Sequence, residues 1–210
     1  MPSLDESIAA GASPVVAILR GVKPEEAVSI GTALVSAGVS LIEVPLNSPQ
    51  PFDSIARLVN ALGSRATIGA GTVLDCAEVA ELARIGAQLV VSPNCDPAII
   101  AATLAAGMSP LPGVMTPSEA FAAIKVGATR LKLFPAGSIS PSHCRALREV
   151  LPSDVGVWAV GGIDARNLGS WFEAGCEGIG LGGSLYRPGD TPDEVRTKAE
   201  KIIAALEARH

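Results

Sequence analysis

The fold is decided by the stretch SAGVSLIEVPL at residues 36–46, in which a glycine stands just before an apolar run. The same pattern returns four times, as RIGAQLVVSPN (84–94), AAGMSPLPGV (105–114), KVGATRLKLFP (125–135) and EAGCEGIGLGG (173–183). Glycine at this place is typical of a helix end, because its left-handed conformation stops the helix before the next strand begins. We therefore interpret each copy as a helix end followed by a strand.

Three more apolar runs bring the number of predicted strands to eight: PVVAILRG (14–21), ATIGAGTV (66–73) and GVWAVGG (156–162). Stretches of helical period lie between the strands, such as PEEAVSIGTALVSAG (24–38) and AEVAELARIG (77–86). Strand and helix thus alternate eight times, with about 26 residues in each unit. This predicts an α/β protein with one domain, a (β/α)8 TIM barrel over residues 1–210. An open doubly wound sheet uses the same alternation, but the count of eight favours the barrel.

The composition limits the classes of protein and partner. Hydrophobic residues make up 48% of the chain and aromatic residues only 3%, which indicates an aliphatic core of the kind found in buried parallel sheets. The net charge of −5, without a basic run, and the scarcity of aromatic stacking platforms predict no nucleic-acid partner. Long apolar runs are all interrupted by charges or helix breakers, so no membrane partner is expected.

The N-terminus and the cysteines predict a cytoplasmic protein. The first residues, MPSLDESIAAGASP, carry two acids and no basic region, unlike a secretory leader. The four cysteines are scattered along the chain, which is typical of free thiols in a reducing compartment. The two histidines, His143 and His210, offer little material for a histidine-based metal site, and no metal is expected.

Lys132 is the sharpest functional signal, because it alone among the lysines interrupts an apolar strand, LKLFP (131–135). Strand alternation puts Lys132 and Phe134 on one face and the neighbouring leucines on the other. If the leucines meet the helices, Lys132 points into the barrel, where burial lowers the pKa of its ammonium group. A neutral amine there is a nucleophile toward carbonyl groups. A structural lysine paired with an acid is the alternative.

Two further charged residues lie on predicted strands. Glu43 sits inside the apolar run LIEVPL (41–46), where a carboxylate facing the lumen could move protons at an imine. It could also neutralise Lys132, and the two interpretations are compatible. Arg20 ends the first strand at the mouth of the barrel, and its guanidinium suits a carboxylate or a phosphate group of a substrate. A surface ion pair is the alternative for Arg20.

Glycines follow the last two predicted strands, as Gly161-Gly162 and Gly182-Gly183-Ser184. The loops after strands seven and eight of a TIM barrel commonly bind phosphate. Glycine lets the backbone come close to a ligand, and backbone N–H groups can hold phosphate oxygens. A single Gly-Gly pair is also common in turns, but two pairs at matching places predict a phosphate site.

Seven motifs carry a resemblance to a known family: VAILRG (16–21), EVPLNSP (43–49), GAGTVL (69–74), VSPN (91–94), LKLFPAG (131–137), VGGI (160–163) and GLGGSLYRPG (180–189). In this order they resemble the motifs of bacterial class I aldolases that cleave 2-keto-3-deoxy-6-phospho sugar acids. The resemblance covers the chain from about residue 15 to residue 188. It implies a phosphorylated 2-keto-3-deoxy sugar acid as the small-molecule partner, no cofactor, no metal and a homotrimer.

The resemblance also implies a role for each matching residue. Lys132 matches the lysine that forms the Schiff base, and Glu43 matches the glutamate that transfers protons. The other matches bind substrate: Arg20, Thr72 of GAGT, Pro93 at the border of the pyruvate pocket, Phe134 beside the lysine, Val160, and the phosphate-binding loops with Gly161, Gly162, Gly182, Gly183 and Ser184.

Two positions depart from the family's gluconate enzymes. Those enzymes usually carry an arginine that binds the pyruvyl carboxylate four residues after the glutamate, where this chain has Asn47, so that role must move, with Arg20 as the candidate. They also usually have a threonine before the Gly-Gly pair, where this chain has Val160. Both features resemble the family's galactonate enzymes, and Val160 would meet C4, the carbon at which the two substrates differ. We expect the galactonate acid as substrate, with the gluconate acid as the alternative.

Three other functions compete with the aldolase. A catalytically silent barrel that binds a sugar phosphate would keep the glycine pairs but would not need Lys132 and Glu43 in apolar strands. A phosphosugar isomerase or epimerase on the same fold would use carboxylates or a metal and would not need an imine-forming lysine. A metal-dependent aldolase is disfavoured by the histidine count.

Overall fold

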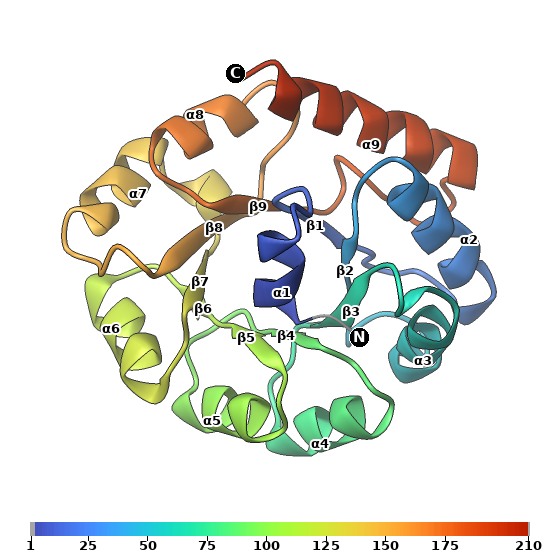
Figure 1. The fold of residues 1–210 in the computed structure, drawn as a ribbon, viewed down its shortest axis with the longest axis horizontal. Helices are drawn as coiled ribbons and strands as arrows, with labels where there is room; N and C mark the ends of the chain where they lie inside the picture. Colours follow the sequence, from blue (N-terminus) through green and yellow to red (C-terminus); the bar gives the residue numbers. More distant parts are fainter. Residues whose placement is uncertain (1–2, 210) are drawn as a thin grey trace.

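The computed structural model describes residues 3–209, which form a nearly closed parallel barrel with helices around it, as predicted (Figure 1). The predictions that involve the first two residues and His210 lie outside the described residues. The strands are β1 Val15–Ile18, β2 Leu41–Pro45, β3 Thr67–Gly71, β4 Leu89–Val91, β5 Ser109–Leu111, β6 Gly113–Val114, β7 Arg130–Leu133, β8 Gly156–Val160 and β9 Gly178–Leu181. They join one sheet in the order β5-β4-β3-β2-β1-β9-β8-β7-β6.

The helices lie on the outside of the barrel, except α1. They are α1 Leu4–Ala9, α2 Pro24–Ser36, α3 Pro51–Leu62, α4 Cys76–Arg84, α5 Pro97–Ala105, α6 Pro117–Val126, α7 Pro141–Arg148, α8 Leu168–Glu173 and α9 Pro192–Glu207, with a short 3₁₀ helix, η1, at Ala136–Ser138. Most begin with proline at the first helical position, where its fixed φ suits the helix and its missing N–H costs no hydrogen bond. No helix within residues 3–209 is long and apolar enough to cross a bilayer.

The recurring glycines end helices, as the sequence pattern predicts. Gly38, Gly86, Gly107, Gly127 and Gly175 all have positive φ angles, between +73° and +115°. Each lies one or two residues after the last helical residue of α2, α4, α5, α6 or α8. Because side chains rarely adopt this conformation, glycine fixes the point at which each helix turns back toward the barrel.

The fifth predicted strand is split in two, and this differs from the expectation of eight unbroken strands. Pro112 separates β5 from β6, because proline has no N–H to donate to a ladder. Its carbonyl still accepts a hydrogen bond of 2.8 Å from the Lys132 N–H, which ties this segment to β7. The next position requires glycine, because a Cβ on Gly113 would lie 2.3 Å from the Pro93 carbonyl oxygen.

The apolar core has two parts. The larger part lies between the strands and the outer helices, and it includes the outward-facing side chains of every strand from β1 to β4 and from β6 to β9. The smaller part fills one end of the lumen with Val16, Leu41, Leu89, Val91, Leu111 and Trp158. This inner cluster is nearly solvent-free, so that end of the barrel is closed by packed side chains.

Helix α1 was not predicted, and it lies across the end of the barrel that the inner cluster fills (Figure 1). Its Leu4 joins that cluster, and the Ser7 hydroxyl lies 2.6 Å from the Thr67 hydroxyl at the start of β3. The helix begins with a capping box, in which Ser3 and Glu6 satisfy each other's backbone N–H groups. This device stabilises a helix of only six residues at the base of the barrel.

Candidate functional site

A cleft of about 460 Å³ opens at the carboxyl ends of the strands, opposite α1. Of the predicted site residues, all except two line it: Arg20, Glu43, Lys132, Phe134, Val160, Gly161, Gly162, Gly182, Gly183 and Ser184. They come from strands β1, β2, β7, β8 and β9, which lie side by side in the sheet. In TIM barrels this is the end at which active sites are built.

Lys132 points into the lumen because its strand alternates. Leu131 and Leu133 belong to the outer core against the helices, whereas Lys132 lines the cleft. Only 6% of the Lys132 surface is exposed, and its Nζ lies 4.5 Å from the centre of the Phe134 ring. The aromatic face stabilises the ammonium form at short range but does not replace its lost hydration.

Burial lowers the pKa of Lys132, because the ammonium group loses water inside the barrel. The negative charge of Glu43 opposes this effect, and the positive charge of Arg20 adds to it. Glu43 and Lys132 make no direct ion pair. The lysine therefore lies in a setting that favours the neutral, nucleophilic amine more than water does.

Glu43 is buried beside it, on the lumen face of β2. Its neighbours Ile42 and Val44 pack in the outer core, and Glu43 itself is only 2% exposed. Gly71 on the next strand makes room for the carboxylate, since a Cβ there would lie 2.1 Å from the Glu43 Oε2. That oxygen has no hydrogen-bond partner among the described residues, so it is available to a ligand or a water.

Burial raises the pKa of Glu43 to about 7, against the opposing pull of the positive charges of Lys132 and Arg20. A carboxyl group with a pKa near neutrality can both accept and return a proton at physiological pH. Glu43 therefore has the properties of a general acid and base.

Arg20 lies at the rim on the same side as this pair. Its Nη1 donates a hydrogen bond of 2.6 Å to the Asn47 Oδ1, so the residue that departs from the gluconate pattern orients the arginine. The positive charge of Arg20 lowers the pKa values of both Glu43 and Lys132. The guanidinium is exposed and remains open to an anion that approaches the lysine.

The turns after β8 and β9 form the other part of the cleft. Gly161 and Gly162 have φ angles of +102° and +72°, so this turn requires glycine. The Ser184 hydroxyl donates a 2.8 Å hydrogen bond to the Ile163 carbonyl and joins the two turns. Within residues 3–209, the backbone N–H groups of Gly162, Gly183 and Ser184 donate to no acceptor. Such N–H groups are suited to an anion.

Two predicted site residues lie outside the cleft lining. Thr72 follows the end of β3 in the left-handed region, with φ of +59°, which is uncommon for a β-branched residue. Pro93 follows β4, and its carbonyl lies against Gly113. Both stand at the carboxyl ends of strands, and their roles in binding substrate stay predictions.

Sequence reasoning missed five residues of the cleft: Ile18, Ile163, Asp164, Gly180 and Arg187. Ile18 and Gly180 could have been found from strand alternation, since they precede Arg20 and Gly182 by two positions. Asp164 and Arg187 lie in loops, where no periodicity indicates which way a side chain points. Among residues 3–209 no group of three or more histidine, cysteine, aspartate or glutamate side chains is arranged to hold a metal ion.

Comparison with known proteins finds relatives that are similar to this chain over most of its length. The 2-dehydro-3-deoxy-6-phosphogalactonate aldolase of Escherichia coli K12 is 45% identical over 192 residues, which cover 91% of this chain and 94% of that protein. The KHG/KDPG aldolase of the same organism is 31% identical, over 84% of this chain and 82% of that protein. A solved structure described as native KDPGal is 44% identical, with a TM-score of 0.92, over 93% of this chain and 95% of the other.

The family model for KDPG and KHG aldolases matches residues 7–198, a span that runs from α1 into α9 and includes every residue of the cleft. The buried lysine and glutamate at the carboxyl end of the parallel barrel lie within this matched span. The chain belongs to the KDPG and KHG aldolase family.

Proposed function

We propose that this protein is a class I aldolase that cleaves 2-dehydro-3-deoxy-6-phosphogalactonate to pyruvate and D-glyceraldehyde 3-phosphate, a step in the breakdown of D-galactonate. The observation that carries the proposal is Lys132, a lumen lysine with a lowered pKa and an acid–base residue, Glu43, beside it. The names of the relatives support the reaction.

The first half of the reaction forms the imine. The neutral amine of Lys132 attacks the C2 ketone of the acid, and a proton reaches the ketone oxygen to give a carbinolamine. Glu43, acting through a bound water, delivers a proton to the carbinolamine hydroxyl, which leaves as water. The product is a protonated imine, in which the positive nitrogen can accept electrons from the C3–C4 bond.

The second half breaks that bond. Glu43, now a carboxylate, removes the proton of the C4 hydroxyl directly or through its water, and the C3–C4 electrons move into the imine to give an enamine. Glyceraldehyde 3-phosphate leaves with C4 as its aldehyde carbon. Protonation of the enamine at C3 and addition of water at C2 then release pyruvate and the free Lys132 amine.

The distribution of cations and N–H groups supports one direction for the substrate in the cleft. The C1 carboxylate is bonded to C2, the carbon that Lys132 attacks, so it must lie near the lysine. Arg20 is the cation whose charge acts on Lys132 and Glu43, and we assign the carboxylate to it. The phosphate on C6 then extends to the glycine turns, whose N–H groups are without acceptors within the described chain.

Three observations favour the galactonate acid over the gluconate acid. Val160 lines the cleft where a threonine hydroxyl would meet C4, and Asn47, which accepts a hydrogen bond from Arg20, stands in place of the second arginine. The overall identity is also higher to the relative named for the galactonate acid, at 45%, than to the one named KHG/KDPG aldolase, at 31%.

Reductive trapping tests the reaction. We expect borohydride in the presence of pyruvate to inactivate the protein and add a three-carbon unit to Lys132, found by peptide mapping. Lys132→Met should prevent the adduct and lower kcat by a factor on the order of 10⁴–10⁶, because no other group replaces the nucleophile. Lys125→Met, which removes an exposed lysine of α6, is the matched control. An adduct on another lysine, or retained activity after treatment, would contradict the proposal.

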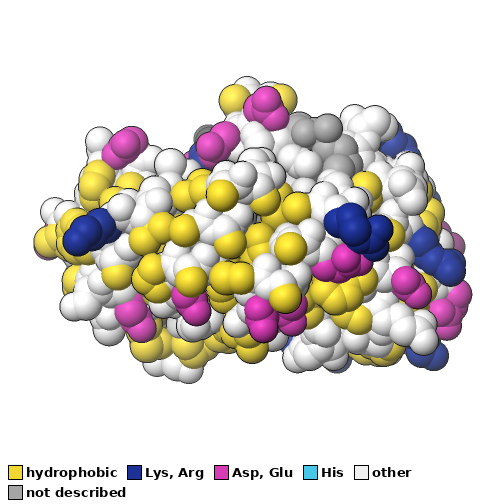
Figure 2. Space-filling model, turned by 90° about the horizontal axis from the view of Figure 1, so that it is seen from below, with side chains coloured by type: hydrophobic (Ala, Val, Ile, Leu, Met, Phe, Trp, Pro, Cys, Tyr) yellow, Lys and Arg dark blue, Asp and Glu magenta, His cyan; other side chains and the backbone are white. Residues whose placement is uncertain are grey.

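We also propose that the protein is a cytoplasmic homotrimer of single-domain subunits. The support is an apolar surface on the side of the barrel where α4, α5 and α6 lie (Figure 2). Three exposed hydrophobic side chains belong to these helices or the residues before them: Leu74 before α4, Leu104 of α5 and Phe121 of α6, with exposed fractions of 56%, 38% and 45%. Such surfaces commonly mark protein interfaces. Light scattering should give three times the chain mass of 21.3 kDa, and Phe121→Asp should shift it toward the monomer.

A further inference from the structure

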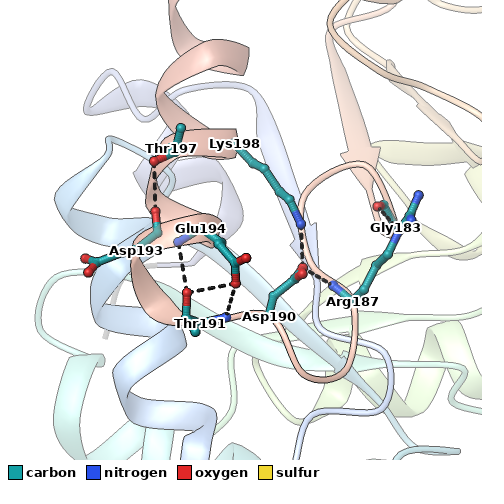
Figure 3. Close-up of polar contacts among 8 residues, drawn as sticks. All are labelled: Gly183, Arg187, Asp190, Thr191, Asp193, Glu194, Thr197 and Lys198. Atoms are coloured by element: carbon teal, nitrogen blue, oxygen red, sulfur yellow. Dashed lines mark hydrogen bonds and ion pairs between the residues drawn. The ribbon is translucent and has the colours of Figure 1, made fainter.

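The loop from β9 to α9 brings an arginine to the cleft that the mechanism above does not use. Arg187 lines the cleft together with Gly182, Gly183 and Ser184 of the same loop. Its Nε donates a hydrogen bond of 2.9 Å to the Gly183 carbonyl, so the guanidinium lies against the glycine turn (Figure 3). The side chain therefore lies against the segment in which the Gly183 and Ser184 N–H groups have no acceptor within residues 3–209.

The position of Arg187 is fixed by the start of α9. Its backbone N–H donates a 2.7 Å hydrogen bond to the Asp190 Oδ2, and the same oxygen accepts from the Lys198 Nζ at 2.6 Å (Figure 3). Thr191 and Glu194, which lies in the first turn of α9, form a capping box at the start of this helix. The loop is thus tied to a long helix at both the backbone and the carboxylate, which reduces its freedom to move.

The Arg187 guanidinium forms no ion pair with a carboxylate among residues 3–209, although its charge is one of the influences that lower the pKa of Asp190. The one nearby carboxylate of the loop, Asp190, pairs with Lys198. The other acid of the cleft, Asp164, is held by Arg166, whose Nη2 donates to it at 2.5 Å. An arginine with only its Nε engaged keeps its terminal N–H groups for a ligand.

The two arginines that line the cleft lie beside different groups. Arg20 acts on Glu43 and Lys132, whereas Arg187 is not among the charges that shift either residue. The cleft therefore has one free cation beside the reacting lysine and another beside the glycine turns. A substrate with a carboxylate at one end and a phosphate at the other has the same arrangement of charge, with opposite sign.

We propose that Arg187 binds the phosphate group of the substrate from above the glycine turns and makes the enzyme select phosphorylated acids over unphosphorylated ones. The proposal rests on the proposed function for the identity of the substrate. Backbone N–H groups donate hydrogen bonds to phosphate oxygens but carry no net charge. The guanidinium of an arginine adds a full positive charge and two parallel N–H donors, which stabilise a phosphate dianion. Selection for the phosphorylated acid follows, because an uncharged C6 hydroxyl gains little from the guanidinium.

Substitution of Arg187 with two matched acids as substrates tests the proposal. Arg187→Gln should raise KM for the phosphorylated acid by about 10–100-fold, since a charge-assisted contact is lost, with a much smaller change in kcat. The same variant should change kcat/KM for the unphosphorylated acid by less than about threefold. Arg187→Lys should recover part of the loss as a point charge without the fork. Arg196→Gln removes an exposed arginine of α9 and should change neither substrate's constants.

Calorimetry with inorganic phosphate tests the same contact without turnover. The unmodified protein should bind phosphate, and Arg187→Gln should weaken that binding by a similar factor, while Arg196→Gln should not. If Arg187 only supports the loop, both acids lose kcat/KM equally on substitution, and the proposal is wrong. An unchanged KM for the phosphorylated acid together with unchanged phosphate binding would also overturn it.

A double-mutant cycle separates positioning from binding. Asp190→Asn weakens the anchor of the Arg187 backbone and should raise KM for the phosphorylated acid by a smaller factor than Arg187→Gln. In the Arg187→Gln background the same change should have little further effect, because the group being positioned is absent. Additive effects would show that Asp190 acts independently of Arg187 and would contradict its positioning role.

The failure of this proposal differs from failure of the aldolase mechanism. Exchange of the pyruvate methyl hydrogens in D₂O needs the imine and the acid–base residue but no phosphate. If the unmodified protein shows neither this exchange nor borohydride trapping, the proposed function is wrong. If it shows both and Arg187→Gln leaves the preference between the two acids unchanged, only the role of Arg187 is wrong.

Discussion

The two ends of the barrel lumen are built from the same strands but carry different side chains. At the end closed by α1, Leu41 of β2 and Trp158 of β8 pack in an apolar cluster without solvent. Two residues further along the same strands, on the same face, stand Glu43 and Val160, which line the open cleft. One end thus contributes apolar burial, and the other holds charges that burial disfavours.

The comparison shows that glycine serves opposite purposes at the two ends. At the closed end Gly178 makes room for the Trp158 ring, to which a Cβ would approach within 2.5 Å. At the open end Gly71 makes room for the Glu43 carboxylate. The first glycine permits dense packing and the second permits a buried acid, so the same substitution should affect stability at one end and chemistry at the other.

The largest effect that tests this contrast is expected from Glu43→Gln. The amide keeps the shape of the side chain but cannot take a proton, so kcat should fall by about 10²–10⁴-fold. The free energy of unfolding should not fall, because a buried ionisable group is replaced by a neutral one. Glu149→Gln, an exposed residue after α7, is the control and should leave kcat unchanged. An unaffected kcat in Glu43→Gln would reduce Glu43 to a counterion of Lys132.

A pair of alanine substitutions then compares the two ends directly. Gly71→Ala should displace the Glu43 carboxylate and lower kcat by about 10²-fold, as small misplacements of catalytic groups do. Gly178→Ala should reduce the free energy of unfolding by about 1–3 kcal/mol through overpacking against Trp158, with kcat per folded molecule unchanged. Urea denaturation and steady-state rates measure both. If Gly178→Ala lowers kcat as strongly as Gly71→Ala, the two ends are not independent.

The alternation of side chains let the fold and the centre of the site be predicted. Lys132 and Glu43 stand out because a charge inside an apolar strand has to be explained, and period two says which face it takes. The glycines at helix ends were equally readable, since few other residues adopt their φ angles. Pro112 was visible too, but the pattern does not show whether proline ends a strand or only interrupts it.

Loops and tertiary position account for what the sequence missed. Helix α1 is too short for its periodicity to stand out, and the spacing of Ser3 and Glu6 is the one local signal that could have indicated it. Arg187 looks like any surface arginine, because its direction depends on hydrogen bonds to Gly183 and Asp190 that no pattern encodes. Thr72 and Pro93 lie at strand ends as expected, yet the cleft lining does not reach them.

The pH dependence provides the next test of the open end. The step that cleaves the C3–C4 bond needs Glu43 as a carboxylate. With its pKa raised to about 7, kcat should fall roughly tenfold for each pH unit below 7 where this step limits the rate. Glu43→Gln should lack this acidic limb. An identical limb in both proteins would assign it to another group.

Because the pKa is raised by folding, Glu43 favours the folded state below its unfolded pKa and loses that contribution as the pH rises through 7. Glu43→Gln should therefore gain stability relative to the unmodified protein between pH 5 and pH 8.

The smallest expected effect concerns Val160, an apolar residue at the open end that lines the cleft. It is only 6% exposed, and it packs tightly over Gly180, where a Cβ would lie 2.8 Å from its Cγ2. Since valine has no hydroxyl, a C4 oxygen directed at it loses a water partner without gaining a protein one, at about 1–3 kcal/mol. We therefore expect a preference of about 5- to 150-fold for the 6-phosphogalactonate derivative over its C4 epimer.

Val160→Thr offers one neutral hydrogen bond, about 0.5–1.5 kcal/mol, and should move the ratio of kcat/KM values toward the gluconate epimer by about 2- to 13-fold. Pyruvate release coupled to lactate dehydrogenase measures both substrates. Equal kcat/KM values for the two epimers in the unmodified protein would show that Val160 does not discriminate at C4, and the lysine chemistry at the other side of the cleft would stand unchanged.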